Sequence, residues 1–177
     1  MKALITGATS GIGLDMARYL ATKGCELILV ARNRENLEII QEKLPTKVTI
    51  VVADLSDEQK VKEVCLIAKQ ENIDILINNA GFGDFGYITD TDLNKDLNMI
   101  NTNIKAVHIL TKSIIKDLEK KDTDTYILNV ASSAGLQPGG PLMATYYATK
   151  AYVRSYTESL YYEEKKKKTK VHVSVLC

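Results

Sequence analysis

Short apolar runs alternate with longer amphipathic stretches along the whole of this 177-residue chain. Each short run is a nearly continuous series of Ile, Leu and Val, which is typical of a strand buried on both faces of a parallel sheet. The runs predict strands at Lys2–Thr6, Glu26–Ala31, Lys47–Ala53, Asp74–Asn78, Thr125–Ala131 and Val171–Leu176. Strand and helix in alternation favour right-handed crossovers and a doubly wound α/β fold.

The stretches between the predicted strands have apolar residues every three or four positions, as on the buried face of a helix. The longest of these patterns extends over residues 93–118, and the last begins near residue 144. We interpret the lysines at 165–168, which end the last pattern, as a solvated helix end. No linker, repeat or low-complexity segment interrupts the pattern. We therefore expect one domain over residues 1–177, with helices on both faces of the sheet in three αβα layers.

Composition and charge exclude several classes of partner. The 23 Lys and Arg residues and 22 Asp and Glu residues leave a net charge of +1, so we expect no nucleic-acid or membrane-surface partner. No apolar run approaches the ~20 residues that span a bilayer, and the first residues do not form a signal peptide. Cys25, Cys65 and Cys177 are odd in number and far apart, which predicts neither a disulfide framework nor a metal site. We expect a cytoplasmic protein.

A glycine-rich turn lies between the first predicted strand and the first predicted helix. It reads Thr6-Gly7-Ala8-Thr9-Ser10-Gly11-Ile12-Gly13. A phosphate group needs free backbone N–H donors at a helix N-terminus, with no side chain in its way. Gly7 would permit the tight turn, Gly11 the approach of the phosphate, and Gly13 the packing of helix on strand. The turn predicts dinucleotide binding through Gly7, Thr9, Ser10, Gly11, Ile12 and Gly13.

The end of the second predicted strand bears on the choice of nicotinamide cofactor. An acid about twenty positions after the turn would accept hydrogen bonds from a free ribose 2′-hydroxyl. This chain has Ala31-Arg32-Asn33-Arg34 there, without a carboxylate, and the Arg32 guanidinium can pair with a 2′-phosphate. The sequence therefore predicts NADP(H) in preference to NAD(H). The alternative is that Arg32 is an ordinary surface residue at a helix start.

A tyrosine and a lysine in the last helical pattern are suited to proton transfer. Tyr146 and Lys150 are four residues apart, so they share one face of a helix. An ordinary phenol, with a pKa of about 10, exchanges protons slowly near neutrality, and a nearby cation favours its phenolate. Such a tyrosine acts as a general acid/base on a carbonyl oxygen or an alcohol. Ser132, at the end of the fifth strand, could hold the same oxygen.

Three further motifs occur in order between the glycine turn and this pair. They are Asn78-Asn79-Ala80-Gly81, Asn101-Thr102-Asn103 and Asn129-Val130-Ala131-Ser132-Ser133. Together with the turn and Tyr146-Tyr147-Ala148-Thr149-Lys150, they resemble the short-chain dehydrogenase/reductase family over essentially the whole chain. The resemblance implies a Rossmann-like sheet in the order 3-2-1-4-5-6. It also implies hydride transfer between a nicotinamide and a small-molecule carbonyl or secondary alcohol.

The resemblance assigns roles to individual residues. It implies a catalytic set of Asn103, Ser132, Tyr146 and Lys150, in which Asn103 positions a water that relays protons to the lysine. It implies further cofactor contacts at Asp54, Leu55, Asn79, Ala80 and Gly81, as well as at Tyr146 and Lys150. The family serine usually stands three residues before the glycine of the next turn, which Ser132 satisfies, and about thirteen before the tyrosine, which Ser133 satisfies. An insertion at Gly139-Gly140 would reconcile the two counts, so we predict Ser132, with Ser133 as the alternative.

Family members usually continue after the sixth strand with a Pro-Gly pair, helices that cover the substrate and a seventh strand. This sequence ends at Cys177, so we expect the seventh strand and the substrate-covering segment to be missing, NADP(H) to bind poorly, and turnover to be slow or absent. The alternative function is a catalytically inactive nucleotide-binding sensor or scaffold. Because the family commonly associates through the long helix around Asp92–Lys120 and the helix after Tyr146, we expect a homodimer or homotetramer.

Overall fold

The computed structural model describes residues 1–177 and contains one six-stranded parallel sheet. The strands are β1 (Lys2–Thr6), β2 (Glu26–Ala31), β3 (Val48–Val52), β4 (Ile75–Asn78), β5 (Thr125–Val130) and β6 (Val171–Leu176). Their order across the sheet is β3-β2-β1-β4-β5-β6, and all neighbours are parallel. This confirms the predicted Rossmann-like order, and each predicted strand end lies within one residue of the observed one.

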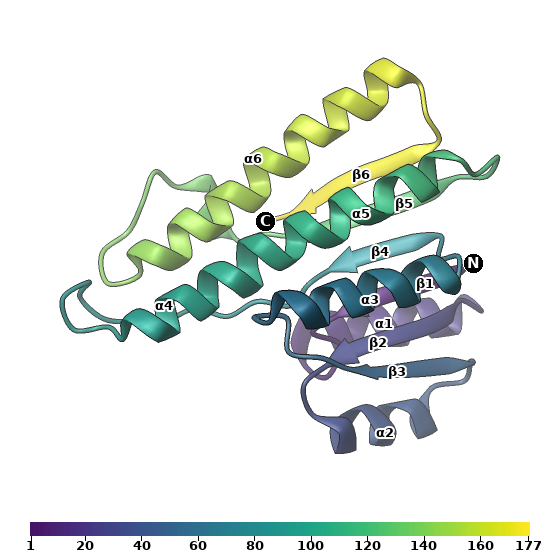
Figure 1. Ribbon diagram of the computed structural model, residues 1–177, viewed down its shortest axis with the longest axis horizontal. Helices are drawn as coiled ribbons and strands as arrows, with labels where there is room; N and C mark the ends of the chain where they lie inside the picture. The colour runs from purple at the N-terminus through teal and green to yellow at the C-terminus, as the bar shows by residue number, and fades with distance from the viewer.

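Helices cover both faces of the sheet and give the three predicted layers (Figure 1). The two on one face are α1 (Gly11–Thr22) and α2 (Arg34–Lys43), and those on the other are α3 (Glu58–Gln70), α5 (Val107–Glu119) and α6 (Ala144–Lys167). Ala17 of α1 and Leu37 of α2 belong to one apolar core cluster with β1 and β2. Val64 of α3 and Leu110 of α5 belong to the other cluster, which Leu160 of α6 joins. The sheet therefore separates two cores.

The long helical pattern forms a continuous helix whose middle is π-helical. Helix α4 (Leu93–Ile100) leads into the π-helical segment η1 (Asn101–Ala106), which leads into α5. The backbone stays right-handed helical through both junctions, at Asn101 and at Val107. π-Helical turns inside α-helices are frequent at functional sites. This one buries Asn103.

The expectation that every strand is buried on both faces is wrong for the strands at the sheet edges. In β6, Val171 and Val173 are buried while His172 and Ser174 are exposed. The reason is that α1 and α2 pack only against the half of the sheet nearer β3, so no helix covers that face of β5 and β6. Tyr126 of β5 is exposed there and stacks on His172, with 5.0 Å between ring centroids.

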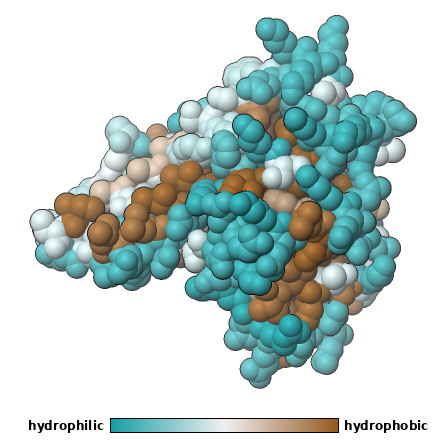
Figure 2. Space-filling view, in the orientation of Figure 1, coloured by the Kyte–Doolittle hydropathy of each residue, from teal (hydrophilic) through white to brown (hydrophobic).

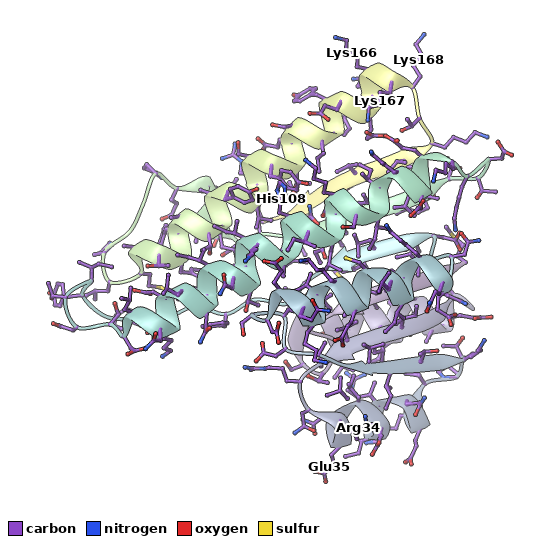
Figure 3. The ribbon with its side chains drawn as sticks, viewed as in Figure 1. Arg34, Glu35, His108, Lys166, Lys167 and Lys168 are labelled. Atoms are coloured by element: carbon purple, nitrogen blue, oxygen red, sulfur yellow. The ribbon has the colours of Figure 1, made fainter.

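The charged end of α6 is solvated, as the sequence predicts. Lys166 and Lys168 point away from the body of the molecule (Figure 3), and Lys167 pairs with Glu119 at 2.7 Å and with Glu164 at 2.8 Å. No helix combines the length and the apolar composition that crossing a bilayer requires.

Candidate active site

The carboxyl ends of the central strands open into a pocket of about 780 Å³, the place where open α/β sheets bind ligands. Among the residues that line it are Gly7, Thr9, Ser10, Gly11, Ile12, Arg32, Asp54, Leu55, Asn79, Ala80, Gly81, Ser132, Tyr146 and Lys150. All the predicted site residues therefore meet in one pocket, except Gly13 and Asn103. Sequence reasoning missed Phe82 and Thr102, which also line it; Phe82 directly follows one of the motifs, and Thr102 lies within another.

The glycine turn leaves free donors and open space at the start of α1. Gly7 and Gly11 have φ of +65° and +49°, the left-handed region that favours glycine. A Cβ on Gly7 would lie 2.9 Å from the Ala80 Cα, whereas one on Gly11 would meet no atom within 4 Å. The Ser10 side chain does not cap the helix, and the first turn carries no acid. These features fit the phosphates of a dinucleotide.

The Asn79 side chain is hydrogen-bonded to the backbone of this turn. Its Nδ2 donates to the Thr6 and Gly7 carbonyls at 3.0 and 3.1 Å. The Thr6 hydroxyl accepts from the backbone N–H groups of Asn79 and Ala80, both at 3.0 Å. A Cβ on Gly13 would lie 2.4 Å from the Asn79 Nδ2. The close packing that Gly13 permits is therefore against the segment after β4 as well as against the turn itself.

Arg32 stands at the pocket wall with its charge uncompensated. It follows the last residue of β2, is exposed, and forms no ion pair. The neighbouring Arg34 pairs instead with Glu38 at 3.6 Å. Asp54 also lines the pocket, and its Oδ1 accepts from the Ser56 N–H and hydroxyl at 2.9 and 2.8 Å. An anion in the pocket would thus meet the free guanidinium of Arg32.

Lys150 brings a buried ammonium next to Tyr146. Both residues belong to α6 and line the pocket, with 5.8 Å between the Lys150 Nζ and the Tyr146 ring centroid. The Nζ donates to the Val130 carbonyl at 3.0 Å. Burial, which penalises the charged form, lowers the pKa of Lys150 to about 8. The arrangement places a cation and a phenol side by side at the carboxyl end of the sheet.

Both candidate serines line the pocket at the end of β5. Ser132 is half-buried, and its Oγ accepts from the Ala134 N–H at 3.2 Å, so its own hydrogen is left to donate into the pocket. Ser133 is exposed and begins the short 3₁₀ turn of residues 133–136.

The family model described as short chain dehydrogenase matches residues 1–177. This chain belongs to the short-chain dehydrogenase family. It is 37% identical over 164 residues to the 3-oxoacyl-acyl-carrier-protein reductase of Rickettsia prowazekii, covering 91% of this chain and 65% of that protein. Curated relatives of this family thus include oxidoreductases.

Two solved structures resemble this short-chain dehydrogenase closely. One is a family member from Burkholderia phymatum in complex with NAD, with a TM-score of 0.92, 29% identity, and coverage of 99% of this chain and 64% of that one. The other is a short-chain dehydrogenase from Sphingobium yanoikuyae in complex with NADPH, with a TM-score of 0.89, 28% identity, and coverage of 98% and 68%. The chain thus spans about two thirds of the length of these proteins.

Asn103 of this short-chain dehydrogenase lies beneath the pocket and not in its wall. Its Oδ1 accepts from the Phe82 N–H at 3.1 Å, and its Nδ2 donates to the Phe82 carbonyl at 2.8 Å and to the Thr149 hydroxyl at 3.1 Å. Both amide hydrogens are therefore used within the protein. A relay water at Asn103 would therefore donate to an oxygen of this residue and not accept from its amide, and the implied role in holding that water stays a prediction.

A second pocket, of about 230 Å³, adjoins the first, and Tyr146 lines both. Its wall includes Tyr87, Ile88, Met99, Leu142 and Met143. The Gly86 N–H donates to the Leu142 carbonyl at 2.8 Å. This hydrogen bond joins the loop after β4 to the loop before α6. No group of three or more His, Cys, Asp or Glu side chains in the chain is placed to hold a metal ion.

Proposed function

We propose that residues 1–177 form a dinucleotide-binding domain that transfers hydride between NADP(H) and a carbonyl or secondary alcohol. The observation that carries this proposal is the position of Tyr146, which lines both pockets and lies beside the buried Lys150 ammonium. The larger pocket has the volume and the phosphate-binding turn for the cofactor. The smaller one, with its apolar wall, would receive the substrate.

When bound, the nicotinamide cofactor would supply the hydride in reduction and accept it in oxidation. In the reduction direction, the Tyr146 hydroxyl would donate a proton to the carbonyl oxygen, and in oxidation the phenolate would take the proton from the alcohol. The Ser132 hydroxyl would donate a hydrogen bond to the same oxygen. The Lys150 ammonium would stabilise the phenolate through its charge.

The test of this function is a fluorescence titration with NADPH combined with turnover of a carbonyl panel. The panel contains small ketones, acyl chains, steroids and sugars. The expected result is weak but saturable NADPH binding, with slow oxidation of NADPH by at least one carbonyl. Saturable binding without any oxidation would favour the alternative of a nucleotide-binding sensor or scaffold, and absence of binding would contradict both.

Arg32 is expected to select NADP(H). Because hydrogen bonds to charged groups contribute about 1.5–3 kcal/mol, Arg32→Ala should weaken NADPH binding about tenfold to a hundredfold and leave NADH binding unchanged. Fluorescence titration with both cofactors measures this, with Arg34→Ala, which removes an arginine already paired to Glu38, as the control. If Arg32→Ala prefers NADPH over NADH as strongly as wild type does, Arg32 does not select the cofactor. Solved relatives hold either NAD or NADPH, so the family alone does not decide the preference.

The two serines are expected to differ in their effect on turnover. Loss of one donor to a reacting oxygen lowers kcat about 10²–10³-fold, and we expect Ser132→Ala to show this loss while Ser133→Ala stays near the wild-type rate. Steady-state carbonyl reduction by both variants measures the difference. Loss only in Ser133→Ala would assign the role to Ser133.

We further propose that the protein forms a homodimer or homotetramer through α4, α5 and α6. Leu93 and Leu97 of α4 are 70% and 47% exposed, and Ile100 follows one turn later at 38%. Figure 2 shows this apolar band along the surface of α4. Packing against a second copy would remove it from water.

A further inference from the structure

A chain of buried hydrogen bonds joins three segments that are far apart in the sequence: the loop after β4, the π-helical segment and α6. Asn103 binds both backbone groups of Phe82, and its second amide hydrogen goes to the Thr149 hydroxyl. Thr149 in turn donates to the Tyr146 carbonyl at 2.8 Å. We propose that Thr149 is a positioning residue that fixes Tyr146 and Lys150 against the loop of residues 81–83, an inference that rests on the proposed function of this pair.

The direction of each hydrogen bond in this chain is determined by its partners. The Phe82 N–H must face an oxygen and the Phe82 carbonyl must face an N–H, so the orientation of the Asn103 amide is fixed. The Thr149 hydroxyl therefore accepts from Asn103, and its single hydrogen is left for the Tyr146 carbonyl. Both Asn103 and Thr149 are 1% exposed, so water does not replace either partner.

The loop that this chain holds lies directly against the reacting pair. A Cβ on Gly81 would lie 3.3 Å from the Lys150 Nζ, and a Cβ on Gly83 would lie 3.0 Å from the Tyr146 Cδ2. Backbone and side chains are therefore in close contact at both positions. A small shift of α6 relative to this loop would move the phenol and the ammonium together, and misplacements of about 1 Å cost on the order of 10²-fold in rate.

Thr157 provides a matched control on the same helix. It is also 1% exposed, accepts from the Nδ2 of a buried asparagine, Asn129, at 2.9 Å, and donates to the Val153 carbonyl at 2.6 Å. Valine at either threonine would leave one buried amide hydrogen without its partner, with the same expected kind of loss in stability. Only Thr149 bonds to Tyr146, the residue whose ring contacts the loop of residues 81–83.

The experiment compares Thr149→Val, Thr149→Ser and Thr157→Val in the full chain. It measures the urea midpoint, kcat and KM for carbonyl reduction, and the titration of Lys150 by ¹⁵N NMR of labelled lysine. The expected result is a similar fall in urea midpoint for both valine variants. Thr149→Val should lower kcat at least about tenfold with little change in KM, since misplacement acts on the chemical step, and Thr149→Ser should restore it.

The Lys150 titration gives a readout that does not depend on turnover. In Thr149→Val its midpoint should rise from about 8 toward the ordinary lysine pKa of about 10.4, because a loosened α6 admits water to the ammonium. Thr157→Val should leave both kcat and the titration as in wild type. If Thr149→Val leaves the titration unchanged, or Thr157→Val reproduces its effects, the positioning role is wrong. If wild type reduces no carbonyl, the proposed function fails, while the titration still decides the role of Thr149.

Discussion

Replacing Tyr146 by phenylalanine is expected to lower kcat/KM for carbonyl reduction about 10²–10⁴-fold, the usual contribution of a positioned acid or base. The ring would remain against Gly83 and between the two pockets, so the shape of the site would be preserved. NADPH binding should weaken only slightly, because the variant loses one hydroxyl contact with the cofactor while the pyrophosphate would still rest on the glycine turn. Steady-state kinetics and an NADPH fluorescence titration on the same sample measure the two quantities separately.

Tyr147 supplies the matched control for this substitution. It is the next residue of the same helix, and its hydroxyl lies 3.4 Å from the Gln137 Oε1, in a solvent-exposed contact. Tyr147→Phe removes the same atom but should leave kcat/KM near the wild-type value. Substantial turnover by Tyr146→Phe, or equal losses in both variants, would remove Tyr146 from the role of general acid/base.

Replacing Lys150 by methionine is expected to abolish most turnover and yet stabilise the fold at neutral pH. The Lys150 ammonium is buried, and its folded-state pKa of about 8 lies below the ordinary value of about 10.4. That difference corresponds to about 3 kcal/mol of unfavourable free energy below pH 8. Methionine would lose the charge-assisted hydrogen bond to the Val130 carbonyl, worth about 1.5–3 kcal/mol. The free energy of unfolding at pH 7 should therefore rise by up to about 1.5 kcal/mol.

The sign of the pH dependence follows from proton counting. Between pH 8 and about 10.4 the unfolded Lys150 still holds its proton and the folded one loses it, so the unfolded state binds more protons. The wild-type penalty is therefore complete below pH 8 and disappears as the pH rises through this window. Consequently the stability gained by Lys150→Met should shrink over the same range.

Urea unfolding of wild type and Lys150→Met at a series of pH values from 6 to above 10 tests this expectation. Lys166→Met is the control, because it removes an exposed ammonium from the solvated end of the same helix. A Lys150→Met variant that is less stable than wild type at pH 7, or a difference that does not vary with pH, would contradict the account of Lys150 as a cation that burial destabilises.

The sequence predicts the sheet well because the signal for each strand is local. A run of Ile, Leu and Val is sufficient to place β1 or β4, and the alternation with helices is sufficient to order the chain into layers. The exposed face of β5 and β6 could not be predicted in this way. Whether a helix covers a given half of the sheet depends on packing between distant segments, and residues such as His172 are exposed for that reason.

In the candidate site, too, the local features could be predicted from the sequence and the long-range contacts could not. Tyr146 and Lys150 could be paired because a helix brings residues four apart onto one face. The orientation of Asn103 could not be predicted, because it depends on a π-helical turn and on partners 21 and 46 residues away, at Phe82 and Thr149. The π-helical turn leaves the apolar pattern of the long helix recognisable, so periodicity carries no sign of it. Thr149 belongs to the motif of residues 146–150, but only the folded chain shows that its hydroxyl is buried.

The Asn79 amide, which donates to the carbonyls of Thr6 and Gly7, links two segments of the domain that are far apart in the sequence. It ties the opening turn to the segment after β4, although 72 residues separate Gly7 from Asn79. A ligand that orders the start of α1 is therefore expected to order the backbone at Asn79 as well.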